Sequence, residues 1–289
     1  MIEGVSIRLR EPTESSVRVT LAPIRDAVDL EGTWELYGPR CEYARTLAST
    51  FRGSATERGA VEFLVTEPCY WSPELPFLYE LRRVDAASDG RVHTLGLRNL
   101  SVHGPNLRLG GKRVVLRGAA TLTLSDQETQ EAHSAEAAIV LRSVDDASLV
   151  AASRWGVFTL VDATAIAGEL AHVIARFSWR PAAAAVLLRG DQLEGVSARG
   201  MECPLLVARR FDSSNVTDTD AIAADCNVAV AIVERGERPP RWMASCGRPV
   251  VAVRRGATYA DFVEARAGCD RLQADLAPEF DLAGYFVAR

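Results

Sequence analysis

The chain has 289 residues, of which 48% are hydrophobic and 25% are charged, and its formal net charge is −5. This balance is typical of a globular protein and excludes a collagen-like, coiled-coil or mainly disordered chain. The negative net charge also argues against nucleic-acid binding driven by an overall basic field.

Residues 1–108 read as a series of short strands. The predicted strands, with turn residues between them, are Val5–Leu9, Val17–Leu21, Val61–Val65, Leu78–Leu81 and Val92–Leu97. Several short strands at this spacing predict a β-sandwich of about 100 residues. The proline-rich segment 67–79 interrupts the pattern, and we expect a crossing loop there because proline cannot donate to a strand ladder.

From Gly110 onward the pattern changes to short apolar runs separated by helical or polar segments. Continuous apolar runs are typical of strands that are buried on both faces of a parallel sheet. The predicted strands are Val114–Arg117, Ala138–Arg142, Val157–Asp162, Ala184–Leu188, Pro204–Ala208, Val228–Val233, Pro249–Val253 and Ala283–Val287. Strands that alternate with helices in this way predict a (β/α)8 barrel. The predicted fold class is therefore multidomain α and β, with a β-sandwich over 1–108 followed by a compact, reduced TIM barrel over 109–289.

Three helices are predicted between the barrel strands. Asp145–Trp155 follows Ser143 and Ala165–Phe177 follows Thr164, and serine and threonine are both good N-caps. Tyr259–Leu276 is long and amphipathic. Roughly 175 residues are few for a barrel that normally takes ~250, so we expect some helices to be reduced or missing. The segment 192–203 is the weakest helix candidate.

Charged residues follow most of the predicted barrel strands. In this kind of barrel the chemistry takes place at the carboxyl ends of the strands. These ends carry the carboxylates Asp162, Asp191 and Glu234 among several arginines, which include Arg142, Arg189, Arg209, Arg254 and Arg255. The residues form either a charged binding pocket or a salt-bridge network that only ties the loops down.

Several segments resemble glycoside hydrolase family 2, the group of β-galactosidases, β-glucuronidases and β-mannosidases. Residues 71–79 (WSPELPFLY) resemble the family's W-S-P-E-x-P-x-L-Y segment, and 109–118 (LGGKRVVLRG) its L-N-G-K-x-V-x-L-R-G segment before the first barrel strand. Weaker matches at 96–100, 141–143 and 156–162 keep the family order. The resemblance implies an immunoglobulin-like sandwich and a TIM barrel, with no room for the family's N-terminal jelly-roll domain. It also implies a retaining glycosidase with two catalytic glutamates.

The catalytic positions depart from the family's pattern. Aligned without a gap, the acid/base glutamate falls on Asp191, and aligned on the preceding glycine it falls on Gln192. The nucleophile of K-P-x-x-x-x-E-x-G-A falls on Arg254. A guanidinium stays protonated and has no acceptor, so it cannot attack an anomeric carbon. It would also repel the positively charged transition state and lower the pKa of a nearby Asp191, whereas a general acid needs the opposite shift.

We therefore interpret the chain as a degenerate relative of the family, a pseudo-glycosidase. The barrel either binds a saccharide or a small anion, such as a uronate, a sulfated sugar or a phosphate, or serves as a structural or partner-binding scaffold. The alternative is an active glycosidase with a non-standard carboxylate pair, Asp191 with Asp162 or Glu234. The predicted site consists of Asp191 as an acid/base remnant, Arg254 in place of the nucleophile, and Arg142, Asp162, Arg189, Gln192, Arg209, Glu234 and Arg255 as binding residues.

The remaining sequence signals concern cofactors, location and partners. The six cysteines form no C-x-x-C pair and the four histidines have no metal-ligand spacing, so we expect no metal and no cofactor. The apolar runs are far shorter than the ~18 residues of a membrane helix, and the N-terminal residues contain no signal-type apolar stretch. We expect a cytoplasmic protein with free thiols and neither membrane nor nucleic-acid partners. Missing helices would expose an apolar flank, which favours a homo-oligomer or a protein partner there.

Overall fold

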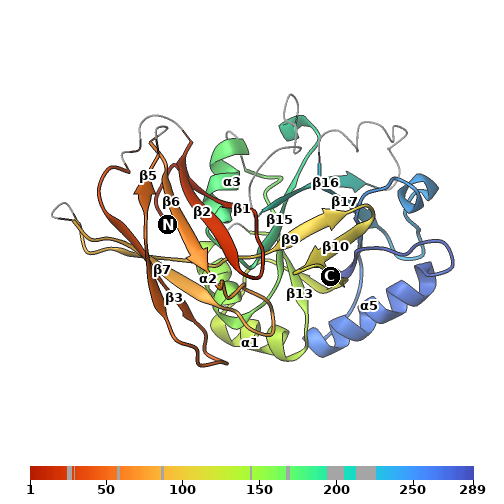
Figure 1. Ribbon diagram of the computed structural model, residues 1–289. Helices are drawn as coiled ribbons and strands as arrows, with labels where there is room; N and C mark the ends of the chain where they lie inside the picture. The colour runs from red at the N-terminus through yellow and green to blue at the C-terminus, as the bar shows by residue number, and fades with distance from the viewer. Residues whose placement is uncertain are drawn as a thin grey trace. The chain divides into compact units, whose positions relative to one another are not determined.

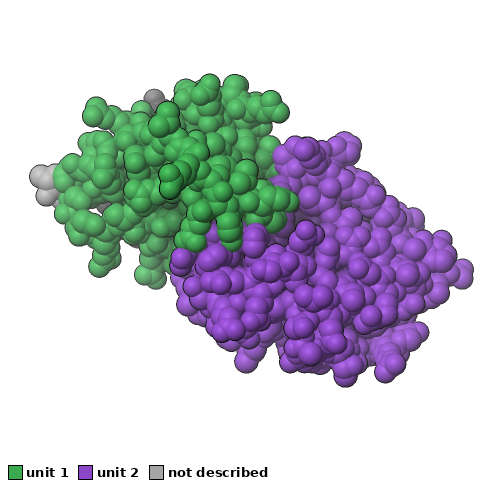
Figure 2. Space-filling model, turned by 90° about the horizontal axis from the view of Figure 1, so that it is seen from below, with its two compact units in different colours: residues 1–99, 167–181, 202–205 green, residues 100–166, 182–201, 206–289 purple. Residues whose placement is uncertain are grey.

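The structure is a computed structural model that describes residues 1–24, 28, 30–56, 59–85, 88–143, 145–166, 170–193, 205–212 and 226–289. The chain divides into two compact units (Figure 2). The first consists of Met1–Asn99, Ala167–Pro181 and Glu202–Leu205, and the second of Leu100–Ile166, Ala182–Met201 and Leu206–Arg289. The expected domain limits, 1–108 and 109–289, stay predictions.

The described part of the first unit contains two antiparallel sheets of four strands, with the orders β1-β2-β6-β5 and β4-β3-β7-β8 (Figure 1). The strands are β1 (Val5–Arg10), β2 (Ser16–Pro23), β3 (Trp34–Arg40), β4 (Ser49–Arg52), β5 (Ser54–Ala55), β6 (Val61–Thr66), β7 (Leu78–Arg83) and β8 (Val92–Leu95). Two such sheets fit the expected β-sandwich, and each of the five strands predicted here forms. Strands β3, β4 and β5 were not predicted.

Alternating burial determines how the sandwich strands pair. In the β2–β6 pair, Val19 lies opposite Phe63 and Leu21 opposite Val61. All four side chains are buried. Because residues two apart on a strand share a face, this register places the apolar residues of both strands on the same side of the sheet.

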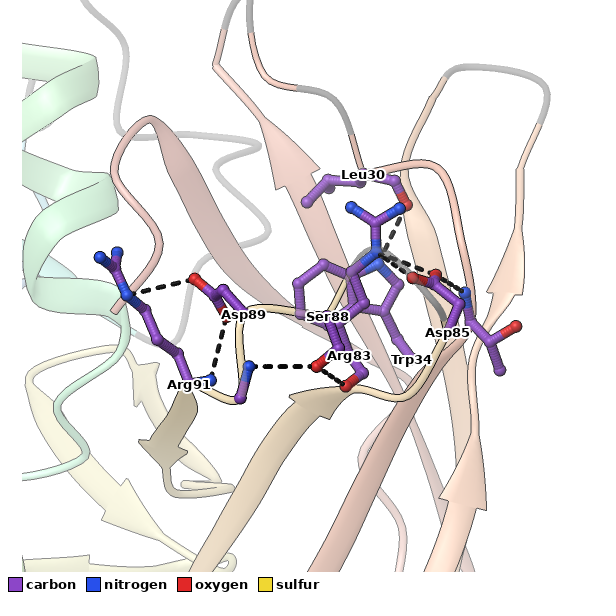
Figure 3. A network of polar contacts seen from close by, with 9 residues as sticks. Leu30, Trp34, Arg83, Asp85, Ser88, Asp89 and Arg91 are labelled. Carbon is purple, nitrogen blue, oxygen red and sulfur yellow. Dashed lines mark hydrogen bonds and ion pairs between the residues drawn. The ribbon is translucent and has the colours of Figure 1, made fainter.

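A polar network joins the ends of β3 and β7 (Figure 3). Nε1 of Trp34 donates to the carbonyl oxygen of Leu30 at 3.0 Å. Nε of Arg83 donates to Oδ1 of Asp85 at 2.8 Å, and Oδ2 of Asp85 accepts from the backbone N–H of Thr33 at 2.8 Å. These bonds satisfy polar groups where the two strands meet the adjoining loops, so the turn after β7 is fixed to the start of β3.

The second unit contains a closed barrel of parallel strands in chain order, which confirms the predicted eight-stranded barrel (Figure 1). The strands are β12 (Leu116–Thr121), β13 (Ala138–Leu141), β14 (Thr159–Asp162), β15 (Ala183–Leu188), β16 (Leu206–Asp212), β17 (Val228–Val233), β18 (Val250–Arg254) and β19 (Gly284–Val287). Their apolar residues are almost all buried, as expected for strands covered on both faces.

The first barrel strand differs from its prediction. The expected strand Val114–Arg117 straddles two elements, because β11 (Lys112–Val114) ends before β12 begins. Strand β11 belongs to a small antiparallel sheet with β9 (Leu100–His103) and β10 (Asn106–Leu109). Gly110 and Gly111 have φ of +54° and +80° in the turn between β10 and β11, a conformation that glycine adopts without strain. The Gly-Gly pair is therefore a hairpin turn.

The helices partly match their predictions. The described helices are α1 (Asp126–Ser134), α2 (Asp146–Trp155), α3 (Leu170–Ser178) and α5 (Phe262–Leu276), with the short 3-10 helices η1 (Asp191–Leu193) and η2 (Arg241–Ala244). Helix α2 is capped by Asp145, not by Ser143, because the Asp145 carboxylate accepts from two backbone N–H groups of the first turn. Thr164, the expected N-cap of the second predicted helix, donates its hydroxyl to the carboxylate of Asp162. Helix α1 was not predicted.

The expected reduction of barrel helices is seen where the structure describes the connections. Between β17 and β18 the described helical segment is η2, which is one turn long. After β15 the described residues form η1. Residues 194–204, which include most of the weakest helix candidate and Cys203, lie outside the described residues, as does 213–225.

Helix α3 belongs to the first unit, where it packs beside the edge strand β1 (Figure 1). The hydroxyl of Ser178 accepts from the backbone N–H of Ile7 at 2.9 Å. The indole N–H of Trp179 donates to the carbonyl oxygen of Val5 at 2.8 Å. These two backbone groups of β1 point away from the neighbouring strand β2. Because Ser178 and Trp179 occupy them, the outer edge of β1 is protected from pairing with a strand of another chain.

We expect Cys269 to resist alkylation in the folded protein. Cys41, Cys69, Cys226, Cys246 and Cys269 carry free thiols. Burial raises the pKa of Cys269 to about 11, so little reactive thiolate exists at about pH 8. Cys41 is partly exposed and serves as the internal control. Iodoacetamide labelling followed by peptide mass spectrometry checks this, and equal labelling rates at Cys269 and Cys41 would contradict the packing of α5 on β12.

Candidate functional site

Arg254, at the predicted nucleophile position, faces the outer helix layer. Side chains of a barrel strand alternate between the barrel interior and the surrounding helices. Cγ1 of Val287 lies 3.2 Å from the position of a Cβ built on Gly268 of α5, so Val287 faces outward. Arg254 is the register partner of Val287 on the neighbouring strand and shares its direction. Nη1 of Arg254 lies 2.7 Å from Oδ2 of Asp275 on α5.

The Arg254 guanidinium is therefore a partner of helix α5. Only 16% of its side chain is exposed, and its buried Nε has no hydrogen-bond partner in the part of the chain that the structure describes. The ion pair with Asp275 compensates the positive charge on the outer side of the strand. The sequence alone predicted a cation that acts on Asp191, and the structure does not bring these two residues together.

Asp191 instead pairs with Arg189, two residues earlier in the chain. Nε and Nη2 of Arg189 each donate to one carboxylate oxygen of Asp191 at 3.0 Å, a two-pronged contact. Hydrogen bonding to Arg189 lowers the pKa of Asp191. The pKa of Asp191 is therefore lowered, as expected, but Arg189 causes this shift and not Arg254. A lowered pKa keeps Asp191 ionised, which does not suit a general acid.

The two other candidate carboxylates have partners of their own. Oε1 of Glu234 lies 3.3 Å from Nη1 of Arg255, which joins the ends of β17 and β18. Oδ1 of Asp162 accepts from the backbone N–H of Thr164 at 3.0 Å and from its hydroxyl at 2.5 Å. Asp162, Asp191 and Glu234 thus each have a different partner, and among the described residues no hydrogen bond joins two of them.

Gln192 connects two loops at the carboxyl ends of the strands. Its Nε2 donates to the carbonyl oxygens of Ala163 and Ile166 at 3.2 and 3.0 Å, and its Oε1 accepts from the backbone N–H of Arg189 at 2.8 Å. The side-chain amide is therefore occupied by the backbone on both its nitrogen and its oxygen. This arrangement positions the turn after β15 against the loop after β14.

Arg209 lies over an aromatic ring of its own strand. Its guanidinium carbon is 5.0 Å from the ring centre of Phe211, a cation–π distance. A Cβ built on Gly190 would lie 2.7 Å from Nη2 of Arg209, so the glycine allows the arginine to approach the turn after β15. Phe211 in turn contacts Trp242 edge to face at 5.8 Å.

One of the predicted binding residues, Arg142, lines a cavity of about 390 Å³ at the carboxyl ends of β12, β13 and β19. The other walls come from the loop after β12, from α1 and from the segment that leads into α5. The lining residues are Ala120, Thr121, Leu122, Glu128, Glu131, Arg142, Tyr259, Ala260, Asp261, Phe262 and Arg289. The sequence analysis missed Tyr259 and Arg289 as site residues; the position of Arg289, two residues after the end of the last barrel strand, was the signal that could have found it.

Two arginines flank Tyr259 in this cavity. The Tyr259 hydroxyl donates to the carbonyl oxygen of Ala120 at 3.1 Å. The guanidinium carbon of Arg289 lies 4.5 Å from the Tyr259 ring centre, and its Nη2 donates to the Tyr259 carbonyl oxygen at 2.7 Å. Burial raises the pKa of Tyr259, and the positive charges of Arg289 and Arg142 oppose this rise. Both guanidinium groups therefore act on the same phenol.

The described residues form neither a metal site nor a membrane-spanning helix. The described part of the chain contains no group of three or more histidine, cysteine, aspartate or glutamate side chains that could hold a metal ion. No described helix combines the length and the apolar character needed to cross a membrane. The cavity beside Arg142 is thus the site that the geometry presents most clearly.

The barrel and the antiparallel sheets together have counterparts among solved structures. No protein-family model matches the chain, and no curated protein matches it. A β-glucuronidase from an uncultured Clostridium species shares a TM-score of 0.68 at 13% identity, over 99% of this chain and 61% of that one. The apo β-glucuronidase 3 of Bacteroides uniformis has a TM-score of 0.64 at 14% identity, over 99% and 46%. The Ruminococcus gnavus β-glucuronidase in complex with D-glucaro-δ-lactam has a TM-score of 0.64 at 10% identity, over 98% and 60%.

These likenesses establish a glycosidase-like fold. At identities of 10–14% they show the fold alone. The chain spans about half to three fifths of the length of these β-glucuronidases.

Proposed function

We propose that the protein is a degenerate relative of glycoside hydrolase family 2 that does not hydrolyse glycosides and instead binds a saccharide or a small anion at the carboxyl ends of its barrel strands. One observation carries the proposal. The side chain aligned with the family's nucleophile is the guanidinium of Arg254, and it forms an ion pair with Asp275. A group that is always protonated and already paired supplies no electron pair to an anomeric carbon.

The environments of the carboxylates support the loss of hydrolysis. A retaining glycosidase needs two carboxyl groups about 5 Å apart, one of them with a raised pKa. Asp191 has a lowered pKa because Arg189 donates to it, and Glu234 is paired with Arg255. The alternative, in which Asp191 and either Asp162 or Glu234 form a new catalytic pair, also needs an acid with a raised pKa, and the pKa of Asp191 is lowered.

The test is a panel of aryl β-glycosides, including a glucuronide, a galactoside and a mannoside. We expect no release of aryl alcohol above the buffer rate from the parent protein. Arg254→Glu is the sharper variant, because a glutamate there would face α5 and the carboxylate of Asp275 and should gain no activity. An increase of tenfold or more in this variant would mean that the position faces a glycoside site, and would overturn the proposal.

Further outcomes separate the remaining functions. Turnover by the parent that disappears in Asp191→Ala would support the non-standard carboxylate pair and refute the pseudo-glycosidase. Thermal stabilisation by saccharides or small anions without turnover supports the binding function, because a ligand that binds only the folded state raises the melting temperature. If no compound is turned over and none stabilises the protein, the binding part of the proposal is refuted and a scaffold role is the remaining function.

A further inference from the structure

The cavity is lined by an arginine, Arg142, whose side chain has no partner among the described residues. The Arg142 guanidinium makes no hydrogen bond or ion pair with any described residue, although its backbone N–H donates to the carbonyl oxygen of Thr121 at 2.8 Å. The other predicted arginines that end barrel strands are engaged with Asp191, Glu234, Asp275 or an aromatic ring. Arg142 therefore keeps its full set of fork-like donors for a ligand.

Arg289 adds a second set of donors across Tyr259. Its Nη2 donates to the carbonyl oxygens of Tyr259 and Ala260 at 2.7 and 3.3 Å, and its guanidinium carbon lies 4.5 Å from the Tyr259 ring centre. These contacts fix the guanidinium in place while leaving its Nε and Nη1 without a described partner. A side chain that is held in advance loses less entropy when it binds a ligand.

The carboxylates of the cavity limit the charge of the ligand. Oε2 of Glu128 accepts from the backbone N–H and hydroxyl of Ser125, and Oδ1 of Asp261 accepts from the N–H of Glu264. Oε1 of Glu131 accepts from Gln127. None of these three carboxylates is bonded to Arg142 or Arg289, so neither guanidinium is paired with them. With three carboxylates beside two guanidinium groups, a dianion would meet more repulsion than a single negative charge, which fits between the arginines, whereas hydroxyl groups of the ligand fit the carboxylates.

We infer that this cavity binds a polyhydroxy compound with one negative charge, a sugar sulfate monoester being the representative class. The oxyanion lies between Arg142 and Arg289, and hydroxyl groups donate to Glu128 and Glu131. Leu122 and Phe262 line the same cavity and offer apolar contact to a sugar ring. The inference rests on the proposed binding function and assigns that function to named residues.

The test uses glucose 6-sulfate, glucose 6-phosphate and glucose in isothermal titration calorimetry with the whole protein. We expect glucose 6-sulfate to bind at least tenfold more tightly than glucose, because charge-assisted bonds to guanidinium groups are about twice as strong as neutral ones. We expect glucose 6-phosphate, whose second pKa is about 6, to bind more weakly than the sulfate at about pH 8.

Arg142→Gln is expected to weaken glucose 6-sulfate binding at least tenfold and to weaken glucose binding much less, because glucose carries no charge for the guanidinium. The matched control is Arg266→Gln, which removes a guanidinium of α5 that pairs with Glu136 and does not line the cavity. Equal affinity for glucose and its sulfate, undiminished sulfate binding in Arg142→Gln, or an equal loss in both variants would overturn the inference. If the protein binds the sulfate through Arg142 but also cleaves aryl glycosides, the inference stands and the proposed loss of hydrolysis fails.

Discussion

Replacing Gly118 with alanine is expected to destabilise the second unit by about 3 kcal/mol, the upper end of the usual cost of overpacking. Gly118 pairs with Ala138 in register across β12 and β13. A Cβ at this position would overlap the carbonyl oxygen of Ala138 and lie 2.5 Å from its carbonyl carbon. Because the obstacle is the backbone of the adjacent strand, relief requires the two strands to separate.

The matched control for this prediction is Gly256→Ala. A Cβ on Gly256 meets no atom within 4 Å, but its φ is +69°, so the substitution carries only the conformational cost of about 1 kcal/mol. Urea unfolding followed by circular dichroism compares the two variants with the parent. A Gly118→Ala protein as stable as the Gly256→Ala protein would show that β12 and β13 do not pair in this register.

The packing at Gly118 also explains one position of the resemblance to glycoside hydrolase family 2. It is the last residue of the segment 109–118, which resembles the L-N-G-K-x-V-x-L-R-G pattern. The glycines of that segment have two different physical roles. Gly111 closes a hairpin with a positive φ, whereas Gly118 makes room for a neighbouring strand. The sequence pattern requires glycine at both positions, but only the structure shows that the physical reason differs between them.

The barrel strands were predictable because a strand that is buried on both faces consists of an almost continuous run of apolar residues. Runs such as Val228–Val233 contain no polar residue, and the structure forms β17 over the same residues. Helix α1 was harder to predict because its sequence, DQETQEAHS, lacks an apolar face: only Thr129 and Ala132 are buried. Its signal was the capping box, in which Ser125 and Glu128 bond to each other's backbone N–H groups.

The candidate site was harder to predict because the direction of a side chain depends on strand register. The sequence placed Arg254 correctly at the end of a barrel strand. A shift of one residue moves a side chain from one face of a strand to the other, and no local pattern distinguishes Arg254 from Arg255. Arg254 binds Asp275 on α5, while Arg255 pairs with Glu234 at the end of the preceding strand, β17. The charges were identified, but not their partners.

Replacing Trp179 with alanine is expected to destabilise the first unit by about 3–5 kcal/mol, the usual cost of removing a large buried aromatic side chain. Trp179 is fully buried in the apolar core of that unit, and its ring meets His93 edge to face at 5.9 Å. The indole N–H also satisfies the carbonyl oxygen of Val5 on the edge strand β1. Thermal unfolding followed by circular dichroism should show the loss, with Trp155→Ala, a partly exposed position, as the control.

Hydrogen exchange locates the effect within the chain. Because Trp179 and Ser178 hold the outer edge of β1, we expect Trp179→Ala to speed amide exchange in β1 and β2 most. Trp179→Phe keeps most of the apolar contact but leaves the Val5 carbonyl without its donor, so its effect should be intermediate and concentrated at β1. Exchange in β18 and β19 serves as the reference, since both strands belong to the second unit. Unchanged exchange in β1 beside a large drop in melting temperature would mean that Trp179 acts through core volume alone and does not protect the sheet edge.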